Sequence, residues 1–240
     1  MTDKNVVVVP MAGLGDRFKR AGYVKPKPFI DVNGKKMINI VLDDIVPHNC
    51  GEVILISLKE SNCREEIKDI KLQNKNAHIN VIELEALTAG SLQTILAAED
   101  RITGKGLILS NCDQKVDIDI DKFVEVCNLY DGGLVTFESQ NPHHSYVEVN
   151  DGVITNIIEK EVISTKAVTG IYYIKDGTEF INAAKSVIKF NKKEKGEFYV
   201  SSALQLLIYK GLKLVSYDAK SYMLGTPEEL ETYLANNINE

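Results

Sequence analysis

Two kinds of segment alternate along the first half of the chain: short runs of apolar, mostly β-branched residues, and longer stretches with apolar residues every three or four positions. The short runs are typical of strands buried on both faces of a parallel sheet, and the longer pattern is typical of amphipathic helices. The alternation predicts an α/β fold with a mainly parallel central sheet, with strands at 6–10, 52–58, 79–84 and 106–110 and helices at 36–46, 61–70 and 91–99.

The second half adds antiparallel structure. Asn150-Asp151-Gly152 is a tight-turn signal between two apolar runs, and it predicts a hairpin of strands 145–150 and 153–159. Thr226-Pro227-Glu228-Glu229 is a capping box with proline at the first helical position, which predicts a closing helix. The other predicted strands are 133–139, 167–174 and 212–217, and the other helices are 178–190 and 200–210. Because no linker or repeat interrupts the 240 residues, we expect a single domain, 1–240.

The first predicted strand runs into a glycine-bearing loop at residues 11–16. Ligands of open α/β sheets bind at the carboxyl ends of strands, and glycine loops expose backbone N–H groups that can hold anionic oxygens. After Gly13 and Gly15, the third glycine of a dinucleotide fingerprint is missing, and no Gly-Lys-Ser or Gly-Lys-Thr follows to make a P-loop. The loop therefore predicts a phosphate site of another kind.

Cationic residues distinguish this loop from other glycine loops. Arg17 follows the glycines, and Lys25 and Lys27 come in a Lys-Pro-Lys-Pro run whose prolines restrict the backbone. A glycine loop, an arginine and a stiffly held lysine together suit a triphosphate. Lys25 is either a second phosphate contact or an exposed neighbour, since lysines are mostly exposed.

The Gly-x-Gly-x-Arg loop, the element Pro26-Lys27-Pro28 and the run Val32-Asn33-Gly34-Lys35 together resemble the signature of the sugar-1-phosphate nucleotidyltransferases. The chain is most similar to the short, single-domain members found in bacterial capsule and surface-polysaccharide gene clusters. The resemblance implies a Rossmann-like α/β/α sandwich of the GT-A-like kind. It also implies transfer of a nucleotidyl group from a nucleoside triphosphate (NTP) to a phosphorylated small molecule, with release of pyrophosphate and with Mg²⁺ as cofactor.

The resemblance also implies roles for individual residues. Lys27 contacts the reacting phosphoryl group, Arg17 neutralises the leaving phosphates, and Asp113, which directly follows a buried strand, binds the metal. The full set is catalytic Arg17 and Lys27; nucleotide-binding Met11, Ala12, Gly13, Leu14, Gly15, Thr88, Ala89, Gly90 and Asn111; acceptor-binding Glu159, Lys160, Thr169 and Gly170; and metal-binding Asp113. From the residues alone, Asp113 can equally cap a turn, Thr88–Gly90 can simply start a helix, and Glu159-Lys160 can be an exposed ion pair.

The chain departs from the family pattern near its C-terminus. The larger family has an aspartate before Gly-Thr that helps to bind a second metal, whereas Met223 stands at that position here. A thioether is too soft to bind Mg²⁺. Either one metal suffices, or another carboxylate such as Glu197 or Asp218 substitutes, or catalysis is impaired.

Composition limits the partners and the setting. A net charge of −6 argues against broad, charge-driven binding to nucleic acid or membranes. The sequence contains neither an apolar run long enough to span a membrane nor a signal peptide, so we expect a cytoplasmic protein. A homo-oligomer is compatible with the sequence.

Three groups of polar residues are interpreted as structural rather than catalytic. The cysteines have no C-x-x-C spacing and lie mostly in apolar surroundings, so we expect buried reduced thiols rather than disulfides or a zinc site. The paired histidines lack ligand companions, and the three aspartates alternate with apolar residues, so both groups are expected on the surface. These residues are Cys50, Cys63, Cys112 and Cys127; His143 and His144; and Asp117, Asp119 and Asp121.

The function predicted from the sequence is therefore nucleotidyl transfer from an NTP to a phosphorylated acceptor, either a sugar 1-phosphate or a non-sugar phosphate such as phosphocholine or phosphoglutamine. CTP is favoured over UTP and dTTP on the resemblance alone. Two alternatives stay open: a glycosyltransferase of the same overall fold, which would use a sugar nucleotide already made, and a nucleotide-binding paralogue that lacks strong catalysis.

Overall fold

The computed structural model describes residues 5–61, 63–74 and 77–236. Its main feature is a sheet of nine strands in the order β5-β4-β1-β6-β11-β8-β12-β10-β9. The strands are β1 (Asn5–Pro10), β4 (Cys50–Leu58), β5 (Ile79–Leu84), β6 (Leu107–Ser110), β8 (Gly132–Glu138), β9 (Tyr146–Asn150), β10 (Val153–Ile158), β11 (Lys166–Ile174) and β12 (Leu214–Asp218). Every strand of the sequence prediction is present, with its ends shifted by at most two residues.

The direction of the strands changes across the sheet, as predicted. Strands β5, β4, β1 and β6 are parallel to one another, whereas β11 runs antiparallel to both β6 and β8. β8 and β12 form a further parallel pair, and β9 and β10 form the predicted antiparallel hairpin. Asp151 and Gly152 of the hairpin turn both have positive φ angles, 50° and 80°, as a tight turn between twisted strands requires.

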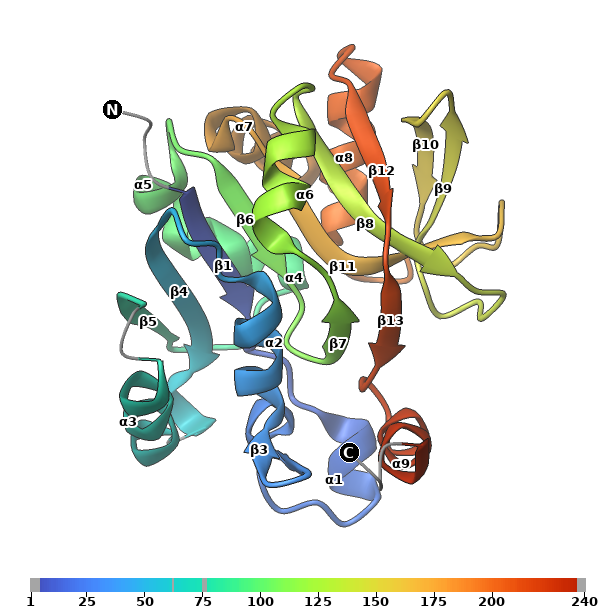
Figure 1. The fold of residues 1–240 in the computed structure, drawn as a ribbon. Helices are drawn as coiled ribbons and strands as arrows, with labels where there is room; N and C mark the ends of the chain where they lie inside the picture. Colours follow the sequence, from blue (N-terminus) through green and yellow to red (C-terminus); the bar gives the residue numbers. More distant parts are fainter. Residues whose placement is uncertain (1–4, 62, 75–76, 237–240) are drawn as a thin grey trace.

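Helices cover both faces of this sheet, which gives the predicted three layers (Figure 1). Along β1, Val6 and Val8 face one layer and Val7 and Val9 face the other, because successive side chains of a strand point to opposite faces. The first layer contains α4 (Ser91–Ile95), α5 (Glu99–Ile102), α7 (Gly177–Lys189) and α8 (Val200–Tyr209), and the second contains α2 (Met37–Ile45), α3 (Arg64–Gln73) and α6 (Ile120–Cys127). The predicted helix 91–99 is divided into α4, a 3₁₀ turn and α5.

A smaller apolar cluster lies beyond one end of the sheet, where α1 (Asp16–Arg20) and α9 (Pro227–Asn236) meet (Figure 1). Phe18 of α1, Met37 of α2 and Leu230 of α9 are buried in it. Beside this cluster lie η1 (Lys27–Phe29) and a two-stranded sheet of β2 (Asp31–Val32) and β3 (Lys35–Lys36). The cluster anchors the loop that follows β1 against the C-terminal helix.

A second small sheet was not predicted from the sequence. β7 (Gln114–Asp117) pairs antiparallel with β13 (Lys220–Met223), with Met223 opposite Gln114. The backbone N–H of Leu224 donates to the carbonyl oxygen of Asp113 over 2.8 Å and continues this pairing by one residue. A segment near the C-terminus thereby fixes the loop that follows β6.

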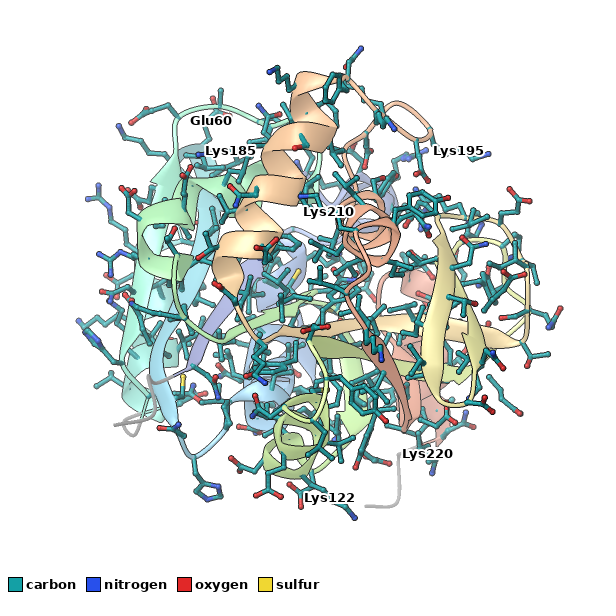
Figure 2. All side chains as sticks on the ribbon, turned by 90° about the horizontal axis from the view of Figure 1, so that it is seen from above. Glu60, Lys122, Lys185, Lys195, Lys210 and Lys220 are labelled. Carbon is teal, nitrogen blue, oxygen red and sulfur yellow. The ribbon has the colours of Figure 1, made fainter. Side chains whose placement is uncertain are left out.

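The charged surface is distributed over several elements. Lys122 of α6, Lys185 of α7 and Lys210 after α8 are all exposed (Figure 2). No helix within the described residues has the length and the apolar content to cross a bilayer. No disulfide joins the four cysteines, and Cys63, Cys112 and Cys127 are buried, as their apolar surroundings in the sequence predict. Positions 2–4 and 62, on which the signal-peptide and helix 61–70 predictions partly depended, lie outside the described residues.

Candidate active site

Two adjoining cavities, of about 660 and 550 Å³, form a cleft at the carboxyl ends of β1 and β6. Lys27, Asn111, Glu159 and Lys160 line both cavities and therefore stand between them. All residues predicted to bind the nucleotide line the first cavity, and the second contains the predicted catalytic Arg17, the predicted metal ligand and the predicted acceptor-binding residues Thr169 and Gly170. The structure thus brings every predicted site residue into one cleft.

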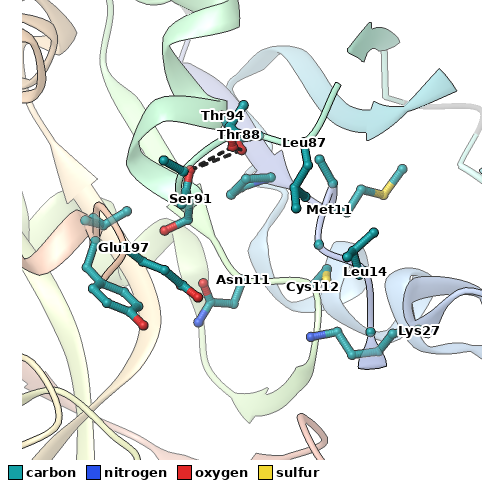
Figure 3. Close-up of a pocket in the computed structure, with 18 of the residues that line it drawn as sticks. Met11, Leu14, Lys27, Leu87, Thr88, Ser91, Thr94, Asn111, Cys112 and Glu197 are labelled. Carbon is teal, nitrogen blue, oxygen red and sulfur yellow. Dashed lines mark hydrogen bonds between the residues drawn. The ribbon is translucent and has the colours of Figure 1, made fainter. Parts of the chain in front are cut away.

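The glycine loop forms one wall of the first cavity. Gly15 has a φ of 65° and is the residue before α1, a left-handed conformation that glycine adopts without a steric penalty. A Cβ on Gly15 would lie 3.4 Å from the Cβ of Lys27, so the loop packs closely on the lysine. In Figure 3, Leu14 and Leu87 lie on the side of the cavity near Met11, where they give this end an apolar surface.

Lys27 and Asp113 form an ion pair in the cleft, with 2.6 Å between Nζ and Oδ2. Their side chains are only 23% and 20% exposed, so water screens the pair weakly. Burial on its own lowers the pKa of Lys27, but the neighbouring Asp113 carboxylate outweighs it and raises this pKa above its ordinary value. Lys27 is therefore a permanent cation at the junction of the two cavities, and Figure 3 shows its amine extended toward Asn111 and Cys112.

Arg17 and Lys25 lie differently from Lys27. Arg17 is exposed on α1 and lines the second cavity, and its charge acts on Lys27. Lys25 is exposed and, among the described residues, belongs to the lining of neither cavity. Of the two alternatives left open for Lys25, the structure favours the exposed neighbour.

The turn Thr88–Ala89–Gly90 closes the first cavity opposite the glycine loop. The N–H of Ala89 donates to Oε1 of Gln93 over 2.9 Å, and the carbonyl oxygen of Ala89 accepts from the N–H of Phe198 over 2.8 Å. The hydroxyl oxygens of Thr88 and Thr94 lie 2.6 Å apart, and each is also within hydrogen-bond distance of the carbonyl oxygen of Gly90 (Figure 3). The turn is therefore rigid before any ligand enters.

Gly90→Ala tests how tightly this turn is held. Gly90 has a φ of 136°, and a Cβ there would lie 2.4 Å from the carbonyl oxygen of Phe198. This steric clash is with backbone, which cannot move away as a flexible side chain could. We expect the variant to lose about 2 to 4 kcal/mol of unfolding free energy, measured by denaturant titration. The matched control is Gly13→Ala, because a Cβ on Gly13 meets nothing within 4 Å. Equal losses in the two variants would contradict the close packing at Gly90.

One wall of the second cavity is built by Asn111 and Gly170. The N–H of Asn111 donates to the carbonyl oxygen of Gly170 over 3.0 Å, across an irregular stretch of β11. Gly170 has a φ of 97°, and a Cβ on it would lie 2.2 Å from Nδ2 of Asn111. Only glycine at position 170 therefore lets the Asn111 amide reach into the cleft. Thr169, next to it, is buried, and its Oγ1 accepts from the N–H of Ile171 over 3.1 Å.

Glu159 and Lys160 follow β10 and do not form an isolated surface pair. The Glu159 carboxylate accepts hydrogen bonds from Ser145 and, over 2.7 Å, from Ser201. Burial raises the pKa of Glu159 despite these two hydrogen bonds. The ammonium group of Lys160 donates to the Tyr199 hydroxyl and lies 4.4 Å from the centre of its ring. Both side chains are therefore held from the start of α8.

Several cleft residues were missed or misjudged from the sequence. Ser145, Ser201 and Tyr199 were not proposed, because nothing in their local pattern marks them as polar groups of a site. His144 was expected on the surface, but it is half-buried and lines the second cavity, where its ring packs against Phe137; His143, also in the lining, is exposed as predicted. Burial lowers the pKa of His144.

Because Met223 replaces the second metal-binding aspartate of the family pattern, a second carboxylate near Asp113 would have to come from another residue. Met223 lines the second cavity close to Gly225, and a Cβ on Gly225 would lie 2.9 Å from Oδ2 of Asp113 and 3.4 Å from Oε2 of Glu229. Glu229 was recognised from the sequence only as part of the capping box, and Oε2 does accept from the N–H of Thr226 over 3.0 Å. The structure therefore places Glu229, and not only a thioether, on the Asp113 side of the cleft.

Asp218 and Glu197, the two residues considered from the sequence as replacements for the missing carboxylate, lie in different parts of the structure. Asp218 forms an ion pair with Lys166 at 2.6 Å and accepts a hydrogen bond from Thr136, in a separate cavity of about 340 Å³. Asp218 is therefore excluded as a substitute carboxylate. Glu197 lines both cavities of the cleft and points toward Asn111 from the opposite wall (Figure 3).

The three alternating aspartates have structural partners. Asp119 caps α6 by accepting from the N–H of Lys122, Asp121 accepts from the N–H of His48, and Asp117 is paired with Lys115 at 3.2 Å. None of the three lines either cavity of the cleft. The prediction that they are structural residues outside the site agrees with this placement.

The family model described as nucleotidyl transferase matches residues 6–236, and the chain belongs to this family. The match covers both the glycine loop and the C-terminal helix, so the whole cleft falls within it.

Individual relatives are more distant. The chain is 28% identical, over 88% of its length, to the bifunctional protein GlmU of Thermodesulfovibrio yellowstonii. It spans about half the length of the curated relatives that it matches. Among solved structures, the nucleoside-diphosphate-sugar pyrophosphorylase from Vibrio cholerae RC9 superposes with a TM-score of 0.82 at 20% identity, covering 95% of this chain and 99% of that one. The inositol-1-phosphate CTP transferase from T. maritima superposes with a TM-score of 0.75 at 17% identity, covering 100% and 98%. These structures share the fold.

Proposed function

We propose that the protein transfers a nucleotidyl group from an NTP to a phosphorylated small molecule and releases pyrophosphate. The observation that supports this most directly is the Lys27–Asp113 ion pair, which lies where the two cavities meet. A half-buried cation and carboxylate at that junction can serve a phosphoryl group that is shared between a ligand in one cavity and a ligand in the other.

The reaction needs charge stabilisation more than it needs proton transfer. The acceptor's phosphate oxygen attacks the α-phosphorus of the NTP, a new P–O bond forms, and the bond to the leaving pyrophosphate breaks. The acceptor is already an anion, so no general base is required, and the site has to align three groups and neutralise their charge. In this proposal Lys27 neutralises the α-phosphoryl group, and the glycine loop and Arg17 hold the pyrophosphate.

The residues in the cleft fit Mg²⁺ when substrate phosphates complete its coordination. No group of three His, Cys, Asp or Glu side chains that could hold a metal occurs in the described part of the chain. Mg²⁺ is commonly bound by one or two carboxylates together with phosphate oxygens and water. Asp113 would be the protein ligand, and Glu229 lies on the same side of the cleft. The ion would supply further neutralisation of phosphate charge.

We favour CTP as the nucleotide and leave the acceptor among sugar 1-phosphates and non-sugar phosphates. The likeness to a structure described as an inositol-1-phosphate CTP transferase supports a cytidylyl donor and a polyol phosphate, while another similar structure is described as a nucleoside-diphosphate-sugar pyrophosphorylase. A role in capsule or surface-polysaccharide synthesis is supported by the resemblance of the opening stretch to proteins from such gene clusters.

The glycosyltransferase alternative has less support. It requires a metal-binding Asp-x-Asp motif in the cleft, and the candidates Asp117, Asp119 and Asp121 are held by other partners outside it. The nucleotide-binding paralogue rests on Met223 alone, and the carboxylate of Glu229 on the same wall weakens that argument.

A pyrophosphate-release screen tests the proposal. The four NTPs, with Mg²⁺, are crossed with sugar 1-phosphates, inositol 1-phosphate, phosphocholine and phosphoamino acids. We expect release that requires one NTP and one acceptor together, with CTP giving the highest rate. Nucleotide binding without release against the whole panel would favour the paralogue, and a reaction only with preformed sugar nucleotides would favour the glycosyltransferase.

A further inference from the structure

The segment from Glu197 to Ser201, which leads into α8, faces the end of β10 across the cleft. Each of the two charged residues after β10 is held by one residue of this segment. The Ser201 hydroxyl donates a hydrogen bond to the Glu159 carboxylate, and the Tyr199 hydroxyl oxygen accepts a hydrogen bond from the ammonium group of Lys160. The segment therefore sets the positions of both charges at the acceptor end.

Tyr199 contacts Lys160 in two ways. The lysine donates to the phenol oxygen, and its ammonium group also lies 4.4 Å from the centre of the ring, within the range of a cation–π interaction. Burial, together with the charge of nearby Glu197, raises the pKa of Tyr199. Tyr199 thus remains a neutral phenol whose oxygen can accept from the lysine.

Lys160 needs such a partner, because lysine is a point charge on a flexible stem. Its backbone is fixed: φ is 53°, and its N–H donates to the carbonyl oxygen of His144 over 3.1 Å. Its side chain, by contrast, can reach either cavity, since Lys160 lines both. A contact that limits these positions lowers the entropy lost when the ammonium group binds an anion.

We propose that Tyr199 is a positioning residue that holds Lys160 for the phosphate group of the acceptor and thereby sets the affinity for the acceptor but not for the NTP. This inference rests on the proposed function, since it assigns the second cavity to a phosphomonoester. It concerns a residue that was not among the site residues predicted from the sequence.

The first experiment needs no catalytic activity. Lysines are labelled by reductive ¹³C-methylation, the Lys160 resonance is assigned with Lys160→Arg, and the protein is titrated with inorganic phosphate. We expect an upfield Lys160 signal, caused by the Tyr199 ring, that is retained in Tyr199→Phe and lost in Tyr199→Leu. The phosphate concentration that half-shifts the signal should rise roughly tenfold in Tyr199→Leu. An ordinary Lys160 shift in the unmodified sequence, or an equal phosphate response in both proteins, would overturn the proposal.

The second experiment uses the acceptor found in the screen. Tyr199→Leu should raise the acceptor KM about tenfold, while the NTP KM and kcat stay within about twofold of the values of the unmodified protein. Tyr199→Phe, which keeps the ring, should have an acceptor KM close to that of the unmodified protein. Phe190→Leu is the matched control, because Lys189 lies 5.9 Å from that exposed ring at the far end of α7. Equal rises in both KM values would show a merely structural effect and contradict the proposal. If no acceptor reacts, the proposed function fails, while the phosphate titration still decides the role of Tyr199.

Discussion

Replacing Lys27 by alanine is expected to lower the rate of pyrophosphate release about 100- to 1,000-fold, the usual cost of removing one donor from developing charge. Lys27 is the only lysine of its Lys-Pro-Lys-Pro run that enters the cleft in the described structure, and its pKa is raised, so its charge is present across the working pH range. The rate is measured with saturating NTP and acceptor, so that a change in binding alone does not account for the loss.

Lys25→Ala is the matched control for this variant. Lys25 precedes Lys27 by two positions in the same proline-bound run, but its side chain is exposed. We expect its rate to stay within about twofold of the unmodified protein, since exposed substitutions usually have small effects. If the Lys27→Ala protein kept its activity, Lys27 would not be a catalytic residue.

The Lys27→Ala protein should remain folded. Breaking a half-buried pair by removing one partner costs on the order of 2 kcal/mol, less than the total stability of a domain of this size. Because the folded pKa of Lys27 is raised, the stabilisation from its charge is fully present below the ordinary lysine value and is lost only as pH rises through the folded value. Circular dichroism and denaturant titration at neutral pH check that the fold is retained.

Asp113→Asn is expected to reduce activity by at least about 100-fold and to raise the Mg²⁺ concentration needed for half-maximal rate. The pH profile should also change. Without the Asp113 charge, burial and the Arg17 charge lower the pKa of Lys27 and only Cys112 opposes them, so the residual activity should begin to fall at a lower alkaline pH than in the unmodified protein.

Asp117→Asn is the control for this second prediction, because Asp117 lies at the far end of β7 with an exposed side chain. Binding of Mn²⁺, followed by electron paramagnetic resonance, gives a readout that does not depend on turnover. If Asp113→Asn bound Mn²⁺ with nucleotide as well as the unmodified protein did, Asp113 would not be a metal ligand. Glu229→Gln measured in parallel shows whether the second carboxylate contributes.

Much of the fold followed from local patterns. The run of four valines in β1 predicted a strand, and the glycine loop after it predicted a ligand loop. Both predictions were possible because a buried strand needs a short run of apolar residues and a positive-φ turn favours glycine, so each can be recognised from a few consecutive residues. The hairpin at Asp151-Gly152 was predicted for the same reason. The cleft could be located because consecutive parallel strands end at one edge of the sheet.

The parts that were missed depend on contacts between distant segments. β7 and β13 are four residues each and pair across about a hundred residues of chain, so neither has a pattern long enough to predict a strand. His144 was placed on the surface because the paired histidines lack ligand companions in the sequence, whereas in the structure its ring packs against Phe137 of β8. Tyr199 and Ser201 were missed because a helix start gives no information about which cleft it faces.

The pairing of β13 with β7 also has a consequence for biosynthesis. A chain growing from its N-terminus can complete β1, β4, β5 and β6 long before residues 220–224 exist, yet the loop that carries Asp113 gains its last backbone partners from Met223 and Leu224. The order of synthesis therefore makes the loop that carries Asp113 one of the final parts of the molecule to be fixed. A nascent chain halted before residue 220 would contain all nine strands of the central sheet and still lack the residues that fix the position of its candidate metal ligand.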